Sequence, residues 1–168
     1  YLYEDYQSMN MKISIITITY NSAKTLPNTL QSVLSQTYPH IEHIIVDGAS
    51  TDGTRDLIET YAKEVQTDKE QCTKEERWVS EKDSGIYNAI NKGIQMATGD
   101  VIGFVHSDDM LYSADSIEHI ANAFSSSDVD LIYGDLQYCK GDKVVRRWKS
   151  NAYNPCALKY GWMPPHPT

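Results

Sequence analysis

The fold is decided by residues 97–109, ATGDVIGFVHSDD. This stretch predicts the end of a helix, a glycine turn at Gly99, a strand over 100–105 and an acidic pair, Asp108 and Asp109, where the strand stops. The apolar run over 101–105 is typical of a strand that is covered on both faces. Because ligands bind at the carboxyl ends of strands in open α/β sheets, the acidic pair is expected at a binding edge.

The acidic pair by itself allows two interpretations. Adjacent hard oxygen donors suit Mg²⁺ or Mn²⁺ held together with a ligand's phosphates. Alternatively, the Ser-Asp-Asp sequence caps a helix that begins near Ser113, since Ser and Asp are common capping residues. The rest of the chain has to decide between them.

Composition narrows the class of protein. The 168 residues suit one globular domain, and 15 Lys and Arg against 23 Asp and Glu give a net charge of −8. This balance argues against a nucleic-acid surface, which depends on cationic side chains. No apolar run approaches the ~20 residues of a membrane span, and there is no signal-peptide pattern. Cys72, Cys139 and Cys156 are too few and too scattered for a disulfide or zinc framework. A cytoplasmic location is expected, and association with the inner face of the cell membrane stays open.

Alternating strands and helices predict an α/β fold. Residues 1–10 show no period and are expected to be an upstream leader, so that the domain starts at Met11. Strands over 12–20 and 41–46 are each followed by an amphipathic helix, which predicts a parallel sheet with right-handed crossovers. The later elements expected are a polar surface excursion over 67–76, a strand over 77–80, a helix over 86–97, a helix over 113–124, a strand over 129–133 and a hairpin over 136–148.

Small and acidic residues fill the loops that follow four of the strands. These loops are 19–23, 47–53, 81–85 and 106–109. Each alone is an ordinary turn, but parallel strands bring all four to one edge of the sheet, which favours a shared site. The chain has neither GxGxxG after the first strand nor a P-loop, so phosphate binding would depend on a divalent ion.

Two blocks of the sequence resemble the large family 2 of glycosyltransferases, in particular bacterial enzymes that build O-antigen and other surface polysaccharides. The blocks are SIITITYNSAKTLPNTLQSVLSQTYPHIEHIIVDGASTDGT (14–54) and SEKDSGIYNAINKGIQMATGDVIGFVHSDD (80–109). The resemblance implies a GT-A fold, a Rossmann-like three-layer sandwich with a mostly parallel central sheet and helices on both faces. It also implies a nucleotide-sugar donor, with a UDP-sugar favoured, Mn²⁺ or Mg²⁺, and inverting transfer to a glycan or lipid-linked acceptor.

The resemblance assigns the nucleotide to residues of the first two loops. It implies that the segment from Thr17 to Asn21 lines the base and that Tyr20 stacks on it. Asp47 is expected to accept a hydrogen bond from the base, such as that of uracil N3–H. Asp52 is expected to hold its loop, or to cap the following helix.

The same resemblance assigns the diphosphate and the metal to later residues of the chain. Asp83 and Lys92 are expected near the nucleotide and its diphosphate, although Lys92 could equally be a solvated cation on a helix. Asp108 is expected at the ribose hydroxyl or the sugar, and Asp108 and Asp109 at the metal. His106 departs from the expected Asn or Asp, and is interpreted either as tuning the metal site or as a buried residue at the strand end.

The catalytic base of a single displacement is expected after Thr168, so this chain is expected to be the donor-binding half, weak or inactive in transfer. His166 resembles a histidine bordering the acceptor side, or is a turn residue between two prolines. The rivals are a non-catalytic nucleotide-sugar-binding domain and a nucleotidyltransferase. The latter should carry a Gly-rich basic loop after the first strand, which TYNSAKTL lacks. A carbohydrate-binding module fits less well, since the aromatic residues are scattered.

Overall fold

The computed structural model of the protein describes residues 11–67, 74–141 and 143–161. Contacts within the chain divide it into two units, with the boundary between Ser127 and Asp128. The leader predicted at 1–10 lies outside the described residues, as do Cys72 and His166.

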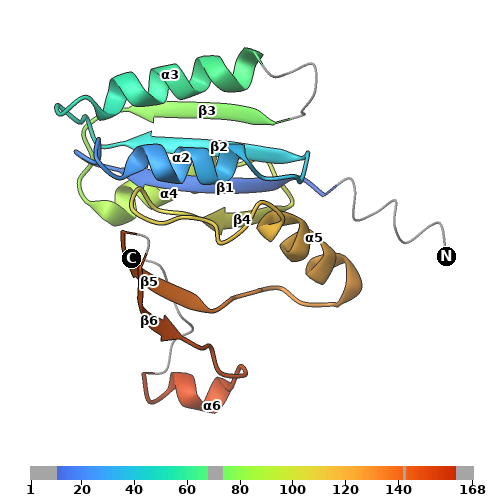
Figure 1. Ribbon diagram of the computed structural model, residues 1–168. Coiled ribbons are helices and arrows are strands. Elements are labelled where there is room, and N and C mark those ends of the chain that lie inside the picture. The colour runs from blue at the N-terminus through green and yellow to red at the C-terminus, as the bar shows by residue number, and fades with distance from the viewer. Residues whose placement is uncertain (1–10, 68–73, 142, 162–168) are drawn as a thin grey trace. The chain divides into compact units, whose positions relative to one another are not determined.

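The first unit is built on a parallel four-stranded sheet (Figure 1). Its strands are β1 (Ile13–Thr19), β2 (Ile41–Asp47), β3 (Glu75–Ser80) and β4 (Val101–Phe104). The strand order is β3-β2-β1-β4, and every neighbouring pair is parallel. Every residue of β1 and β2 is buried, because both strands are central and covered on both faces. The predicted α/β class and parallel sheet are confirmed.

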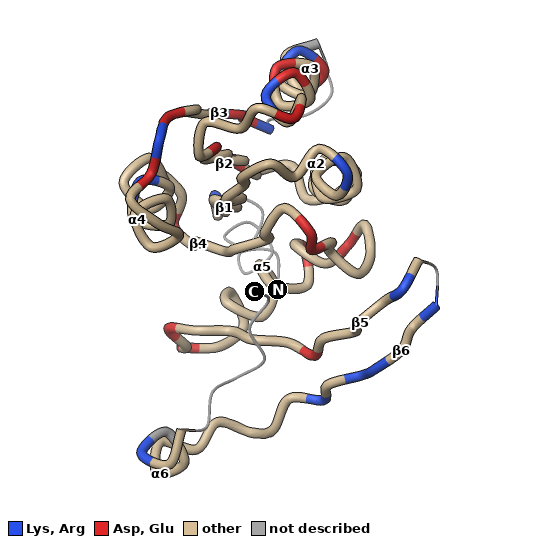
Figure 2. The backbone as a smooth tube through the Cα atoms, turned by 90° about the vertical axis from the view of Figure 1, so that its left-hand side faces the viewer, with Lys and Arg blue, Asp and Glu red and all other residues tan. Residues whose placement is uncertain are grey.

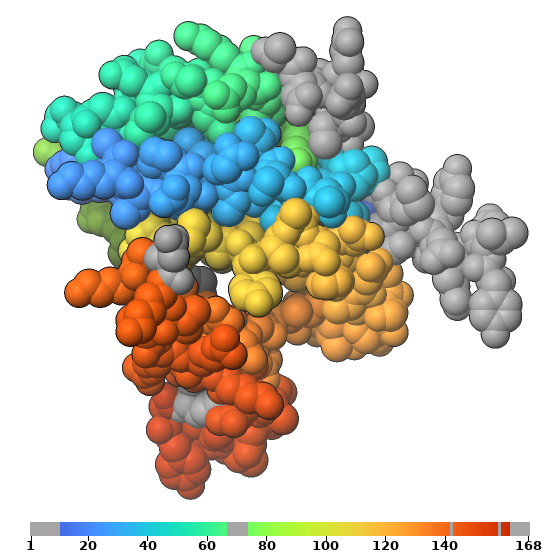
Figure 3. Space-filling view, in the orientation of Figure 1, coloured from blue at the N-terminus to red at the C-terminus, as the bar shows by residue number. Residues whose placement is uncertain are grey.

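Helices cover both faces of this sheet. The helices are α2 (Leu26–Leu34), α3 (Thr54–Thr67), α4 (Ile86–Met96) and α5 (Ser116–Ser126). On one face Leu30 of α2 and Ile58 of α3 pack with Ile45, and α5 extends the same layer. On the other face Ala89 of α4 packs with Ile16. Figure 3 shows α2 and α3 side by side over the first face. This arrangement is the predicted three-layer sandwich. Among the described residues, no helix has both the length and the apolar character that crossing a membrane requires.

Two glycines let α4 and β4 approach β1 closely. A β-carbon on Gly93 would lie 2.5 Å from Ile16 Cγ2, and one on Gly99 would lie 2.6 Å from the Lys12 carbonyl oxygen. Neither distance is compatible with a side chain, so both positions require glycine. The glycine turn predicted before β4 is therefore present, and close contact rather than a left-handed backbone is its reason.

Two strand predictions need correction. β4 was expected to be covered on both faces, but Ile102 is 40% exposed and Val101 and Phe104 are only partly buried. Separately, β4 pairs with β1 alone among the described strands, so it stands at the edge of the sheet. β3 begins at Glu75, inside the stretch interpreted as a surface excursion, because Glu75 and Glu76 pair with β2.

The second unit contains an antiparallel hairpin, as predicted. Its strands are β5 (Leu136–Lys140) and β6 (Lys143–Trp148), and a short helix, α6 (Pro155–Leu158), follows. Asn154 caps α6 by accepting a hydrogen bond from the Cys156 N–H at 3.0 Å. The strand predicted over 129–133 is wrong: these residues pair with no strand in the described part of the chain, and Val129 and Leu131 are exposed. The cysteines Cys139 and Cys156 are free.

Candidate functional site

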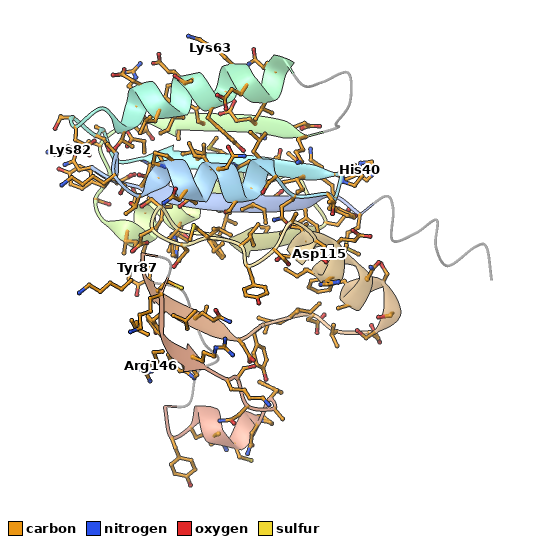
Figure 4. All side chains as sticks on the ribbon, in the orientation of Figure 1. His40, Lys63, Lys82, Tyr87, Asp115 and Arg146 are labelled. Carbon is orange, nitrogen blue, oxygen red and sulfur yellow. The ribbon has the colours of Figure 1, made fainter. Side chains whose placement is uncertain are left out.

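The topology of the sheet creates one switch point, between β1 and β4. The chain adds β2 and then β3 on one side of β1, and α4 then crosses the opposite face to place β4 on the other side of β1. Ligands of open α/β sheets bind at the carboxyl ends of the strands that flank such a point. The four predicted loops follow the carboxyl ends of β1, β2, β3 and β4. Figure 4 shows Lys82 and Tyr87 at this same side of the sheet. We call this the carboxyl edge.

Side chains and backbone tie the loops after β1, β2 and β4 together. The Asn21 N–H donates to Ser50 Oγ at 2.7 Å, and the Thr51 N–H donates to Asn21 Oδ1 at 3.0 Å. The hydroxyls of Ser22 and Ser107 lie 3.0 Å apart, which connects the loop after β1 to the acidic loop. The predicted convergence of these loops is therefore observed, and Asn21 takes part in it as a connection between loops.

Asp47 is the buried centre of the loop after β2. Its side chain is 0% exposed, and its carboxylate accepts hydrogen bonds from the Ser50 hydroxyl at 2.5 Å, the Ser50 N–H at 3.0 Å and the Ser80 hydroxyl at 2.6 Å. These donors occupy three of about four acceptor positions on a carboxylate. Asp47 thus holds two loops in place, and a hydrogen bond from a base to the remaining position stays a prediction.

Asp52 performs both of the roles expected for it. One carboxylate oxygen accepts from the Thr54 N–H and hydroxyl at 3.1 and 2.6 Å, which caps the start of α3. The other oxygen accepts from the Ala23 N–H at 3.0 Å, which anchors the loop after β1. The Thr54 hydroxyl, together with the Ala23 N–H, holds the pKa of Asp52 below its usual value.

Thr17 lies beneath the carboxyl edge, and its predicted role needs correction. Its side chain is fully buried; the hydroxyl donates to the Val105 carbonyl at 2.6 Å and lies 2.9 Å from His43 Nε2. His43 Nδ1 in turn lies 2.7 Å from the Tyr61 hydroxyl. Burial lowers the pKa of His43 to about 3, so the ring is neutral. The Thr17 side chain therefore cannot line a base; it fixes the backbone just before the acidic loop.

Tyr20 presents an open aromatic ring at the edge. It is 66% exposed, which leaves the ring accessible to a base. Gly48 lies beside it: a β-carbon there would be 3.2 Å from Tyr20 Cδ2 and 3.7 Å from Asp83 Oδ2. Tyr20 and Asp83, which belong to different loops, thus both lie close to the space that a side chain at Gly48 would fill. Sequence reasoning did not identify Gly48.

Lys92 is a paired cation rather than a solvated one. Its ammonium forms an ion pair with Asp83, whose side chain is nearly buried, and another with Glu81 at 2.8 Å. The hydrogen bond with Asp83 raises the pKa of Lys92. Asp83 and Lys92 therefore lie next to one another, and their place near the nucleotide and its diphosphate stays a prediction.

The acidic loop is held from below by α2. The buried Thr29 hydroxyl lies 2.8 Å from the Asp109 carbonyl oxygen and 3.3 Å from that of His106. The Asp109 N–H donates to the same His106 carbonyl at 3.0 Å and closes the turn. Asp108 is exposed and Asp109 half-buried at this turn, and His106 is buried, which agrees with its interpretation as a buried strand-end residue.

The polar face of α2 is a feature that sequence reasoning missed. Besides Thr29, the Ser32 hydroxyl accepts from the Leu111 N–H at 3.3 Å, and the Gln36 amide donates to the Ser113 carbonyl at 2.8 Å. Thr29 and Ser32 lie three positions apart on α2, and Gln36 follows just after the helix ends at Leu34, so a polar side of this segment was visible beside the apolar stripe. The capping alternative for Asp108 and Asp109 fails, because α5 begins only at Ser116.

The acidic pair fits a divalent cation that a ligand helps to bind. Within 11–67, 74–141 and 143–161, no three or more His, Cys, Asp or Glu side chains gather into a metal-binding group. Mg²⁺ and Mn²⁺ are, however, commonly held by one or two carboxylates together with substrate phosphates and water. Asp108 and Asp109 supply that number of hard oxygen donors at the carboxyl edge.

Comparisons with known proteins agree with this geometry. The family described as "Glycosyl transferase family 2" matches residues 14–167. The "PGL/p-HBAD biosynthesis glycosyltransferase" of Mycobacterium bovis (strain BCG / Pasteur 1173P2) is 36% identical over 126 residues, which cover 73% of this chain and 46% of that protein. The chain thus spans less than half the length of this relative.

Two similar solved structures contain nucleotide sugars. The mannosyltransferase PcManGT from Pyrobaculum calidifontis, in complex with GDP-Man and Mn²⁺, gives a TM-score of 0.60 at 26% identity over 77% of this chain and 36% of that one. The structure of S. aureus TarS 1–349 in complex with UDP-GlcNAc gives a TM-score of 0.56 at 26% identity over 69% of this chain and 32% of that one. Both confirm the α/β fold.

Proposed function

The chain belongs to glycosyl transferase family 2, and we propose that its carboxyl edge binds a nucleotide-sugar donor for inverting transfer to a glycan or lipid-linked acceptor. A UDP-sugar is the favoured donor, and the synthesis of surface polysaccharide is the favoured process. We also propose that the protein acts in the cytoplasm, the location expected from its cysteines.

One observation carries the proposal: an exposed aromatic ring and an acidic pair follow the two strands that flank the switch point. Tyr20 follows β1, and Asp108 and Asp109 follow β4. The Ser22 and Ser107 hydroxyls, 3.0 Å apart, connect the loops that carry them. An aromatic ring can stack on a base, and the acids can hold a metal that binds a diphosphate. These two features therefore suit the two ends of a nucleoside diphosphate. The nucleotide sugars named with the two similar structures support this choice of ligand.

Each residue of the edge has a distinct part in the proposed reaction. Tyr20 stacks on the base, while Asp47, Asp52 and Asn21 keep the loops around it in place. Asp83, paired with Lys92, borders the nucleotide. Asp108 and Asp109 would hold Mn²⁺ or Mg²⁺, which when bound neutralises the charge of the departing diphosphate.

The proton of the acceptor hydroxyl requires a general base. We assign that base to none of the described residues and keep the expectation that it follows Thr168. His166, outside the described residues, keeps its proposed place at the acceptor side. Transfer by this chain alone is accordingly expected to be weak or absent.

A calorimetric titration with UDP tests the proposal. We expect binding in the presence of Mn²⁺ and at least about tenfold weaker binding without it, because the cation links the diphosphate to the acids. Asp109→Asn should lose the Mn²⁺ dependence. Asp56→Asn, an equal loss of charge on the exposed side of α3, should keep it.

The result separates this proposal from its rivals. No binding of UDP or GDP at millimolar concentration with Mn²⁺ would contradict the donor site. Binding that is equal with and without Mn²⁺ would favour a non-catalytic nucleotide-sugar-binding domain. Tight, metal-dependent binding of a nucleoside triphosphate in preference to UDP would favour a nucleotidyltransferase.

A further inference from the structure

The β5–β6 hairpin concentrates positive charge in an otherwise acidic chain. Residues 136–149 contain five Lys and Arg but one acidic residue, Asp142, which gives a net charge of +4. Because the whole chain carries −8, the remainder carries −12. Figure 2 shows the basic positions along β5 and β6. The basic residues are Lys140, Lys143, Arg146, Arg147 and Lys149.

The hairpin cations are exposed, and all but Lys149, whose charge acts on the Asp135 carboxylate, form no ion pair among the described residues. Every residue of β6 is exposed. In the part of the chain that the structure describes, none of the ion pairs involves Lys140, Lys143, Arg146 or Arg147. In the first unit, by contrast, Lys12 and Lys92 each pair with two acids. The hairpin charge is therefore available to an anionic partner.

Aromatic and aliphatic side chains lie among these cations. The Arg146 guanidinium lies 5.6 Å from the centre of the Tyr138 ring and 5.7 Å from that of Trp148, so the three share one face of the hairpin (Figure 4 labels Arg146). Both rings are partly exposed, Val144 is exposed on the same face of β6, and Val145 is exposed on the opposite face. Trp and Tyr with flanking Lys and Arg are the combination that anchors proteins at the boundary between water and lipid.

We propose that the β5–β6 hairpin binds the surface of an anionic phospholipid bilayer. The Lys and Arg side chains contact headgroup phosphates, and Tyr138 and Trp148 lie at the boundary with the acyl chains. A nucleic acid would also attract the cations, but it offers no apolar phase to Val144 and Trp148, and this favours the bilayer. Such a contact would keep the protein where a lipid-linked acceptor resides.

Sedimentation of the whole chain with vesicles tests this proposal. We expect binding to vesicles of phosphatidylcholine mixed with phosphatidylglycerol and little binding to phosphatidylcholine alone. Binding should weaken in high salt, because the Debye length falls from about 10 Å at 0.1 M to about 3 Å at 1 M. Equal binding to both vesicles, or binding to duplex DNA without binding to either, would overturn the proposal.

Charge variants locate the effect on the hairpin. Each basic residue near an anionic leaflet strengthens binding about fivefold, so Arg146→Glu/Arg147→Glu should weaken it at least about 25-fold. Arg146→Gln/Arg147→Gln, which adds no repulsion, should give a smaller loss and replaces the first variant if that fails to fold. The single variants Arg147→Glu on the hairpin and Lys63→Glu on α3 (Figure 4) change the charge equally, and the proposal fails if these two variants lose vesicle binding equally.

UDP binding by the hairpin variants distinguishes a failure of this proposal from a failure of the proposed function. No hairpin residue is assigned to the nucleotide, so the hairpin variants should bind UDP with Mn²⁺ as the parent chain does. Loss of vesicle binding with intact UDP binding supports the hairpin surface. Variants that lose both together would overturn its separation from the donor site.

Discussion

Carboxylates lie at both ends of the parallel strands: at the carboxyl edge and at the opposite side of the sheet, where the strands begin, which we call the amino edge. The two edges differ in how these carboxylates are paired. At the amino edge, the buried Glu42 accepts from the Ser14 hydroxyl at 2.6 Å and from the Thr98 N–H and hydroxyl, both at 2.8 Å. Lys12 Nζ and Arg77 Nη1 lie 3.6 and 3.5 Å from its Oε1. The described residues thus supply this carboxylate with three hydrogen bonds and two nearby cations.

At the carboxyl edge, the acids divide into two kinds. Asp47 resembles Glu42, since it is buried and accepts three hydrogen bonds from Ser50 and Ser80, which leave about one acceptor position for a base. Asp108 is exposed at the tip of a turn that α2 holds in place. A position at the binding edge therefore does not by itself make an acid available to a ligand. The comparison separates acids that build the edge from those that can meet a ligand.

The largest expected effect tests the amino edge. Burial raises the pKa of Glu42, but hydrogen bonds from Ser14 and Thr98 and the charge of Lys12 outweigh it and hold the pKa below its usual value. Glu42→Ala should lower the free energy of unfolding by about 3–5 kcal/mol, because it leaves buried donors and nearby cations without their acceptor. Chemical denaturation measures this loss.

Asp108→Ala is the matched variant at the other edge. It should change stability by less than about 0.5 kcal/mol, as exposed positions do, while weakening Mn²⁺-dependent UDP binding. Equal losses of stability in the two variants would remove the distinction between the edges.

The protonation of His43, beneath the carboxyl edge, should change the free energy of unfolding by an amount similar to that of Glu42→Ala. The pKa of His43 is about 3 in the folded chain, below the 6.5 of an unfolded histidine, so the unfolded state binds a proton that the folded state does not. Its contribution is complete above pH 6.5 and is lost as the pH falls toward 3. We expect stability to fall by about 3 kcal/mol over this range, allowing for relaxation of the site.

The control for this effect keeps the hydrogen bonds but removes the titration. In His43→Gln, an amide can still reach Thr17 and Tyr61, and the loss of stability between pH 6.5 and 3 should shrink. Denaturation curves at a series of pH values compare the two proteins. Identical pH profiles would show that His43 does not control acid stability.

A smaller effect should come from the support of the acidic loop. Thr29→Val keeps the shape of the side chain but removes the hydroxyl at the His106 and Asp109 carbonyls. We expect a loss of about 1–2 kcal/mol in stability and about tenfold weaker UDP binding with Mn²⁺. Thr29→Ser restores the hydroxyl and should recover binding. Unchanged affinity in a folded Thr29→Val protein would mean that α2 does not position the acids.

The smallest effect contrasts two glutamates near the amino edge. Unlike Glu42, Glu76 has a buried oxygen, Oε1, with no hydrogen-bond partner among the described residues, and burial raises its pKa to about 7. The folded chain then binds the extra proton, so stability falls as pH rises from about 4.5 to 7. Glu76→Gln should gain on the order of 1 kcal/mol at pH 8, after screening is allowed for, and little at pH 4. A gain of the same size at both pH values would contradict this account.

The sequence predicted the strands and helices of the first unit because their apolar residues follow clear periods. It predicted that four loops share an edge, since parallel strands require it. It could not show that Thr17 and Asp47 are buried, because the groups that surround these two side chains come from other strands and loops. The edge position of β4 and the absence of a strand over 129–133 depend on pairing between distant segments, which local patterns do not contain.

A crystal structure of the chain with UDP and Mn²⁺ tests the central claim most directly. The account predicts the uracil ring against Tyr20 and the metal at Asp108 or Asp109, with the diphosphate between them at the switch point of β1 and β4. A nucleotide bound away from this point, or a metal held by other residues with Asp108 and Asp109 directed elsewhere, would contradict it.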